Sequence, residues 1–503
     1  MPLLRPALVP IALAALTLVA CGGGAQGVQG EVDAGEDAGT DAGTDAGSGN
    51  TGDAGPCPTD PPPDALGDAV VTPGESNRYL LKGRVATPDS LFEPGQVLVV
   101  NDKIACVGVD CSSDANAAGA TIIDTKGVIF PGLVDAHNHT QYDYLPPYTP
   151  TPPMLFQNRG QWAARSDYSA WTASVNDNEG TYVCEQVKYG ELRALMGGTT
   201  TIEGSYNIAL KCFRTLVHNA EYGNELGTSK MRTNIPGVDS VTSDYATTLR
   251  NGMLDGSITA YVIHLAEGVD AKSKNEFATL VSKGLLLPPT VIIHGTALTQ
   301  TEFAQMAQAG AKLIWSPDSN LILYGATTDV RTAMAAGVSV SIAPDWTLSG
   351  SGTVLAELKV ARQVSCTQWD GLLDAKTLVK MATSNPADAL ALGQYIGRIQ
   401  PGLLADLLVI ADRGQETYRT LVEARPQDVR LVMIAGNLRY GDSALIAATG
   451  RAPCDALQMC GVEKRICVAD STDATDKLNE GLIQIVQAVS GFYTNPYRFD
   501  LCP

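Results

Sequence analysis

The sequence predicts an α/β protein whose main domain is a (β/α)8 TIM barrel. Three apolar runs favour this fold, because each reads as a buried strand and each leads into a histidine. The runs cover residues 130–136, 258–263 and 290–293, and the histidines are His137, His264 and His294. In such barrels the active site lies at the carboxyl ends of the strands, where these side chains would converge.

The first run ends in a pair of histidines. His137 and His139 point to the same side of a strand, because successive side chains alternate between its faces. Two neutral imidazoles in this arrangement suit a divalent metal such as zinc. The spacing alone also fits two structural histidines, so the metal interpretation depends on the other strand ends. His218 stands apart, since residues 213–219 have a helical pattern, and we expect it to be structural.

The remaining barrel elements follow in order along the chain. Residues 198–203 read as the second strand, 230–235 as a middle strand, 312–315 as the seventh and 341–346 as the end of the eighth. Helical patterns fit residues 301–309 and 329–336, so strands and helices alternate as a parallel barrel requires. One further strand is expected between residues 206 and 257, but the pattern does not locate it.

The order of these motifs resembles the amidohydrolase superfamily, and within it the deaminase and triazine-hydrolase-like branch. The matching pieces are His137-Asn138-His139 on the first strand, His264-Leu265-Ala266-Glu267 after the fifth, Ile293-His294-Gly295 at the sixth and the segment ending in Asp345-Trp346 at the eighth. The resemblance covers roughly residues 78–440. In the family the segments that flank the barrel pack together as a small β-sandwich.

The resemblance implies a catalytic metal centre. Its ligands would be His137, His139, His264 and Asp345, which hold one divalent ion, zinc or alternatively iron, and leave a position for water. Asp345 would take a proton from that water, and Glu267 would carry it to the leaving nitrogen. His294 would hydrogen-bond the water or the developing charge. Each residue also has a plainer interpretation, as a core histidine or an acid at the start of a helix.

Two features separate this chain from parts of the superfamily. Many deaminases of the branch have glycine after the eighth-strand aspartate, whereas Asp345 is followed by Trp346, so we expect a different pocket floor. Binuclear members bridge two metals with a carboxylated lysine, but Lys211 and Lys230 are the only lysines of the middle region and neither sits at a clear strand end. We therefore expect one metal.

These features predict a metal-dependent hydrolase of non-peptide carbon–nitrogen bonds, acting at an amidine or cyclic amide carbon. The alternatives are a binuclear amidase or dipeptidase of the same superfamily, and a non-catalytic surface binding protein on a decayed barrel. The loop at residues 142–171 is rich in aromatic residues and proline. If it lines the site, it favours a ring-containing small-molecule substrate; if not, it is a packed cap.

The amino-terminal region predicts export. Residues 1–20 read as a signal peptide, and Leu18-Val19-Ala20-Cys21 resembles a lipoprotein cleavage box, so we expect an extracytoplasmic protein anchored to a membrane through lipidated Cys21. An uncleaved anchor or a buried helix is the alternative. Residues 21–75 repeat Asp-Ala-Gly and are expected to form a disordered tether. The acids of this tether account for much of the net charge of −19, and no basic patch indicates nucleic-acid binding.

The expected domains are therefore a sandwich split between residues 76–130 and 396–445, a barrel at 131–395 and a cysteine-rich appendage at 446–503. Of the 11 cysteines, those other than Cys21 are even in number, which allows up to five disulfides in an exported protein. The absence of Cys-x-x-Cys disfavours a thiolate zinc site. The sequence does not indicate the oligomeric state.

Overall fold

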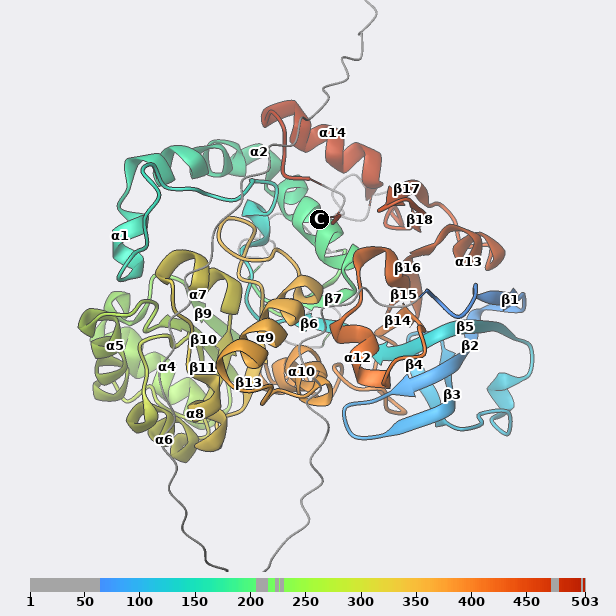
Figure 1. Cartoon of the computed structure of the whole chain (residues 1–503), viewed down its shortest axis with the longest axis horizontal. Helices are drawn as coiled ribbons and strands as arrows, with labels where there is room; N and C mark the ends of the chain where they lie inside the picture. Colours follow the sequence, from blue (N-terminus) through green and yellow to red (C-terminus); the bar gives the residue numbers. More distant parts are fainter. Residues whose placement is uncertain are drawn as a thin grey trace, which may run out of the picture. The chain divides into compact units, whose positions relative to one another are not determined.

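The computed structural model describes residues 64–204, 216–221, 226, 230–471, 479–498 and 501–502. The expected signal peptide, Cys21, most of the expected tether and Lys211 lie outside these residues. The described part is a mixed α/β fold in which three sheets are combined with helices (Figure 1). No described helix is long and apolar enough to cross a membrane.

The largest sheet joins the two ends of the described chain. Its order is β17-β18-β16-β15-β14-β5-β2-β3-β4, with β1 paired to β5. The strands are β1 (Val70–Thr72), β2 (Glu75–Ala86), β3 (Leu91–Val100), β4 (Lys103–Gly108), β5 (Ala120–Pro131), β14 (Leu407–Ala411), β15 (Val429–Ile434), β16 (Asn437–Asp442), β17 (Asp455–Met459) and β18 (Val462–Ile466). The amino- and carboxyl-terminal segments meet where β5 pairs with β14. The sheet also takes strands from both sides of the expected sandwich, β1 before residue 76 and β17 and β18 after residue 445.

Eight short parallel strands form the other two sheets. One contains β6 (Leu133–Asp135), β7 (Thr199–Ile202) and β8 (His218–Asn219). The other contains β9 (Met231–Asn234), β10 (Ala260–Leu265), β11 (Thr290–His294), β12 (Lys312–Trp315) and β13 (Val340–Ile342). A parallel bridge between Asn138 and Asp345 joins the segment after β6 to the segment after β13.

Helices connect most of these parallel strands. They are α1 (Arg159–Ala163), α2 (Ser166–Met196), α4 (Ser243–Asp255), α5 (Ala271–Ser282), α6 (Gln300–Ala309), α7 (Pro317–Tyr324), α8 (Val330–Ala335), α9 (Val354–Gln368), α10 (Ala375–Ala382) and α11 (Ser384–Ala389), with α12 (Thr417–Val422), α13 (Ser443–Ala448) and α14 (Leu482–Phe492) beyond them. Short 3-10 turns lie at Ala115–Ala117, Thr140–Tyr142, Val238–Ser240 and Pro426–Asp428. The helices expected at 301–309 and 329–336 are confirmed as α6 and α8.

Local sequence explains where these helices begin and end. The side chain of Asp270 accepts a hydrogen bond from the Ser273 amide and caps the start of α5, an interaction worth about 1 kcal/mol. Helices α4, α6 and α7 all end at glycines in the left-handed conformation, which glycine adopts without steric cost. These capping residues and glycines therefore fix where the helices begin and end, and so where the chain can turn back towards the parallel sheet.

The helical interpretation of residues 213–219 is wrong for its last two residues. His218 and Asn219 form β8, which pairs in parallel with Thr201 and Ile202 of β7. This strand supplies the element that the sequence pattern did not locate. The buried His218 ring lies 3.1 Å from a carboxylate oxygen of Asp406, in the segment before β14, so it joins the parallel sheet to the large sheet.

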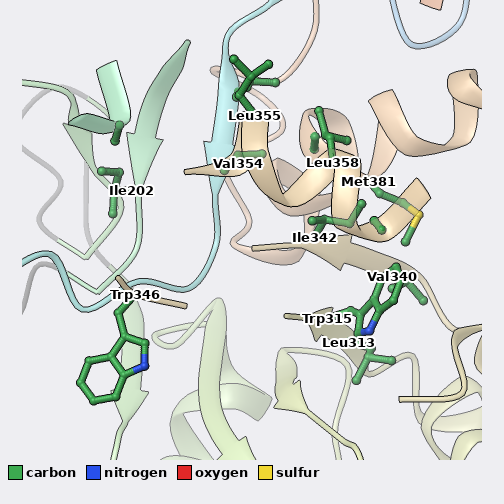
Figure 2. Packing of buried hydrophobic residues seen from close by; sticks show 14 of the residues in the cluster. Ile202, Leu313, Trp315, Val340, Ile342, Trp346, Val354, Leu355, Leu358 and Met381 are labelled. Atoms are coloured by element: carbon green, nitrogen blue, oxygen red, sulfur yellow. The ribbon is translucent and has the colours of Figure 1, made fainter. Parts of the chain in front are cut away.

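The core between strands and helices is apolar. Figure 2 shows side chains of β12 and β13 packed beside those of α9 and α10, and these include Leu313, Trp315, Val340, Ile342, Leu358 and Met381. Burying one such aliphatic side chain contributes about 1.5–3 kcal/mol, so this layer holds the strand ends in fixed positions.

The carboxyl-terminal segment is held by disulfides and by packing. Disulfides join Cys454 to Cys467 and Cys460 to Cys502, while Cys106 and Cys111 form a third pair near the other end. Every cysteine in the described residues is disulfide-bonded. Helix α14 lies along α2, where Tyr144 packs against Phe492 and Tyr493 (Figure 1).

Candidate active site

Five predicted site residues lie together at the carboxyl ends of the parallel strands. His137 and His139 follow β6, His264 lies near the end of β10, His294 ends β11 and Asp345 follows β13. The ligand atoms of His137, His264 and His294 lie within 4.8 Å of one another, and so do those of His137, His139 and Asp345. Nε2 of His137 is 3.0 Å, and Nε2 of His139 3.5 Å, from Oδ1 of Asp345.

The backbone around the site is held in unusual conformations. His294 and Asp345 have φ of 68° and 67°, a left-handed conformation that costs a non-glycine residue about 1–2 kcal/mol. Neighbouring hydroxyls hold both residues. Thr328 Oγ1 donates to the His294 carbonyl at 2.6 Å, and Ser319 Oγ donates to Asp345 Oδ2 at 2.7 Å. Such strain persists only where the surroundings impose it, as they do at functional sites.

The electrostatics of the site favour a cation. Burial, with the nearby His137, lowers the pKa of His139 to about 3, and burial lowers that of His264 well below its usual value. Both rings are therefore neutral and offer lone pairs. Burial alone would lower the pKa of His137, but the Asp345 and Glu203 carboxylates outweigh it and raise the value to about 10. A proton on His137 thus supplies positive charge when no metal is bound.

The residues present fit a divalent metal. Among the described residues, His264 Nδ1 and Glu267 Oε2 are buried without a hydrogen-bond partner. A buried polar atom in this state costs about 1–3 kcal/mol, and a bound ion with its water relieves that cost. Several neutral imidazoles and one carboxylate are the donor set of a catalytic zinc site. His294 lies close enough to reach the same ion or its water.

Glu267 lies in the loop after β10, and its carboxylate lies beside His294. Its backbone carbonyl accepts from the Arg159 amide at 3.1 Å, and the preceding residue, Ala266, has a φ of 55° and donates its amide to Glu276 Oε2 at 2.7 Å. Glu267 Oε2 lies 3.7 Å from His294 Nε2 and 3.7 Å from Arg159 Nη1. The loop therefore places the carboxylate beside His294, one of the clustered histidines.

Several supporting residues were not found from the sequence. Glu203 is fully buried at the end of β7, with Oε2 3.9 Å from His137 Nδ1 and Oε1 accepting from Thr233 Oγ1 at 2.8 Å. Asn320 of α7 lies 3.1 Å from His294 Nδ1. Glu203 carried a signal that could have found it, because it stands at a strand end as the histidines do.

A cavity of about 360 Å³ is lined in part by the site residues His139, His264, Glu267 and Asp345. Its wall includes four aromatic side chains, those of Tyr142, Trp162, Tyr168 and Trp346. Three of the four belong to the loop at residues 142–171, which therefore lines the site rather than serving only as a cap. Trp346 forms another part of the wall, with its ring centroid 4.8 Å from that of His139. Arg159 is the one lysine or arginine among the described residues that line this cavity.

Comparison with known proteins agrees with this geometry. Residues 256–439 match the amidohydrolase family. The chain is 25% identical over 414 residues to a 5-methylthioadenosine/S-adenosylhomocysteine deaminase from Syntrophobacter fumaroxidans, covering 73% of this chain and 93% of that protein. Its fold is similar to that of a zinc-bound adenosine deaminase from Xanthomonas campestris, with a TM-score of 0.57, 19% identity and coverage of 75% and 97% of the two chains. It is also similar to a zinc-bound atrazine chlorohydrolase from Arthrobacter aurescens, with a TM-score of 0.58, 17% identity and coverage of 74% and 99%.

The site and these matches define the class of protein. The chain is a hydrolase that acts on carbon–nitrogen bonds other than peptide bonds. The family match and the structural neighbours support a place in the amidohydrolase superfamily, and the cluster of histidines and aspartate supports a divalent metal.

Proposed function

We propose that this protein is a mononuclear zinc-dependent hydrolase in which water attacks an amidine or cyclic amide carbon of a ring-containing small molecule, with release of ammonia from the amidine. The observation that carries the proposal is the convergence of buried imidazoles and two carboxylates, Asp345 and Glu267, at the mouth of an aromatic cavity. The deaminase relative, whose name specifies a purine nucleoside substrate, supports the ring chemistry.

In this proposal the metal is held by His137, His139, His264 and Asp345. When bound, it makes a water ligand acidic enough to lose a proton near neutral pH. Asp345 is ionised, because its histidine neighbours hold its pKa low even though burial alone would raise it, and its carboxylate is the acceptor for this proton. Glu267 Oε2 then carries a proton to the leaving nitrogen, so that ammonia departs as a neutral molecule.

His294 orients the attacking water. Its Nδ1 faces Asn320 Oδ1, which can only accept, so the ring proton lies on Nδ1. Burial lowers the pKa of His294, so the ring is neutral and Nε2 presents a lone pair. This lone pair accepts a hydrogen bond from the water and directs it at the substrate carbon.

A single metal is proposed because the described residues supply no bridging lysine. Lys230 is exposed, and its Nζ donates to the Gly256 carbonyl at 3.4 Å, away from the histidines. The binuclear amidase would need a second set of ligands. Elemental analysis of metal per chain distinguishes the two enzymes, and a chain that takes up no metal on reconstitution would be a binding protein.

The activity is tested by ammonia release from ring amidines, purine nucleosides first, with zinc-reconstituted protein. Glu267→Gln should keep its zinc yet lose about 100-fold or more in kcat, because it removes only the proton carrier. A metal-loaded wild-type protein that neither releases ammonia from any ring amidine nor opens any cyclic amide would contradict the proposal.

We also propose that the two parallel sheets are the halves of one (β/α)8 barrel, with the large sheet as the β-sandwich beside it. The bridge between Asn138 and Asp345 supports closure, because it links the first parallel strand to the last. We further propose anchoring outside the cytoplasm through lipidated Cys21. Labelling with a radioactive fatty acid that persists in Cys21→Ser would contradict that anchor.

A further inference from the structure

We propose that Tyr324 is a positioning residue for Glu267 and that Trp162, from the cavity wall, holds Tyr324 in place. This inference rests on the proposed function, because it concerns the carboxylate that carries the proton. The three residues come from separate elements, α1, α7 and the loop after β10. Through them the wall of the cavity becomes part of the proton-transfer machinery.

The contacts form one buried chain. The Tyr324 hydroxyl donates to Glu267 Oε1 at 2.7 Å, and the Trp162 indole Nε1 donates to the Tyr324 hydroxyl at 2.9 Å. All three side chains are at least nine-tenths buried. Exchange with water therefore does not compete with these hydrogen bonds.

The chain can run in only one direction. An indole N–H donates and cannot accept, so the Tyr324 oxygen must act as the acceptor towards Trp162. The single hydroxyl proton is then left for Glu267. Burial and the nearby Glu267 raise the pKa of Tyr324 well above its usual value, so the hydroxyl keeps this proton at any working pH.

The consequence is that the two oxygens of Glu267 have different tasks. Oε1 is occupied by Tyr324, whereas Oε2 is buried without a hydrogen-bond partner among the described residues. Oε2 faces Nε2 of His294 at 3.7 Å. Oε2 is therefore the oxygen that receives the proton from Asp345 and passes it to the leaving nitrogen, and the bond from Tyr324 to Oε1 keeps Oε2 turned towards the site.

A double-mutant cycle tests the inference in the zinc-loaded enzyme. Tyr324 does not line the cavity, so Tyr324→Phe should lower kcat by about 10-fold to 100-fold while KM stays within about twofold. In the Glu267→Gln background the same substitution should cause no further loss, because Tyr324 acts only through that carboxylate. Trp162→Phe also changes the cavity wall and should raise KM, but the part of its kcat loss that acts through Tyr324 should disappear in the Tyr324→Phe background, so the two kcat losses should be less than additive.

The matched control is Tyr418→Phe. Tyr418 of α12 is another buried tyrosine. Its hydroxyl donates to the Thr87 carbonyl at 2.9 Å, a contact that involves none of the site residues. This variant should lose stability but keep kcat. If Tyr324→Phe lowers kcat by the same factor in the wild-type and Glu267→Gln backgrounds, the inference is overturned, because that result would indicate a general structural effect.

A second readout does not depend on activity. The Tm shifts of Tyr324→Phe and Glu267→Leu should be non-additive in the zinc-loaded protein, since phenylalanine lacks the donor and leucine lacks the acceptor, so each removes the same hydrogen bond. Additive shifts would overturn the positioning role. If the wild type releases no ammonia yet the Tm shifts are non-additive, the proposed function fails while the contact between Tyr324 and Glu267 stands.

Discussion

Glu203→Gln should weaken zinc binding although Glu203 is not itself a ligand. The carboxylate lies 3.9 Å from His137 Nδ1, in a fully buried position. A negative charge there favours positive charge on the ring, and therefore stabilises the imidazole when its other nitrogen binds a cation. The substitution keeps the size of the side chain and removes only the charge.

The expected magnitude follows from this distance. Two full charges at this separation interact by about 4 kcal/mol at an effective dielectric constant of about 20. The ring of a bound ligand carries only part of the metal charge, so we expect about 1.4–2.7 kcal/mol, which is about 10-fold to 100-fold in zinc affinity. Thr233→Val, which removes the hydroxyl that holds Glu203 Oε1, should weaken zinc binding by a smaller factor.

The measurement is competition with a chromophoric zinc chelator over a series of pH values, from which the affinity of the unprotonated His137 ring is obtained, because Glu203 also stabilises the proton that zinc displaces from this ring. Glu191→Gln is the matched control, because Glu191 is also a fully buried carboxylate but accepts from the Leu216 amide at 2.8 Å. The control should bind zinc as the wild type does. If Glu203→Gln also binds zinc within about twofold of the wild type, the carboxylate does not act on His137 and the reasoning is refuted.

Three further predictions concern the same site. His264→Ala should lose its zinc, as elemental analysis would detect, and a variant that keeps one zinc would exclude His264 as a ligand. Because the pKa of His137 is about 10 without metal, zinc should displace about one proton near neutral pH, and affinity should rise with pH; calorimetry in buffers of different ionisation enthalpy measures this release. Burial, partly opposed by Arg193, raises the pKa of Asp143 to about 7, so the metal-free folded state keeps a proton that the unfolded state loses above about 4. Stability should therefore fall as pH rises from about 4 to 7, by up to about 4 kcal/mol, and denaturant titrations of Asp143→Asn should show this fall removed.

The sequence was informative where a residue's position depends on local pattern. A buried parallel strand is readable from its own apolar side chains, and its end fixes where the next polar residue goes, as with His264 and His294. The structure brings these residues together with Asp345 and Glu267, which stand in the same relation to their strands. The sequence pattern did not reveal β8, because a strand of 2 residues is too short to show a periodic alternation of apolar side chains.

The supporting residues could not be predicted for a different reason. Asn320 and Tyr324 lie on α7, and nothing in that helix indicates that one reaches His294 and the other Glu267. Their partners are set by how α7 packs over the strand ends, which is a property of the tertiary fold. Such residues carry no motif because many side chains could fill the same helical pattern.

Trp346, the departure from the usual glycine, has a second role besides shaping the cavity. Its indole N–H donates to Ser349 Oγ at 2.7 Å, which lies 2.9 Å from Ser319 Oγ, and Ser319 in turn donates to Asp345 Oδ2 at 2.7 Å. Because the indole can only donate and the Ser319 proton is already used, the Ser349 proton must point to Ser319.

Both carboxylates of the proposed mechanism are thus held by hydroxyl chains that begin at a tryptophan of the cavity wall. Trp162 leads through Tyr324 to Glu267, and Trp346 leads through two serines to Asp345. A donor that cannot accept fixes the direction of every proton after it, so each carboxylate always receives a hydrogen bond on one oxygen. The two tryptophans therefore both line the cavity and orient the carboxylates that move protons in the proposed mechanism. A substitution of either tryptophan that accommodates a different substrate ring should consequently also alter proton transfer.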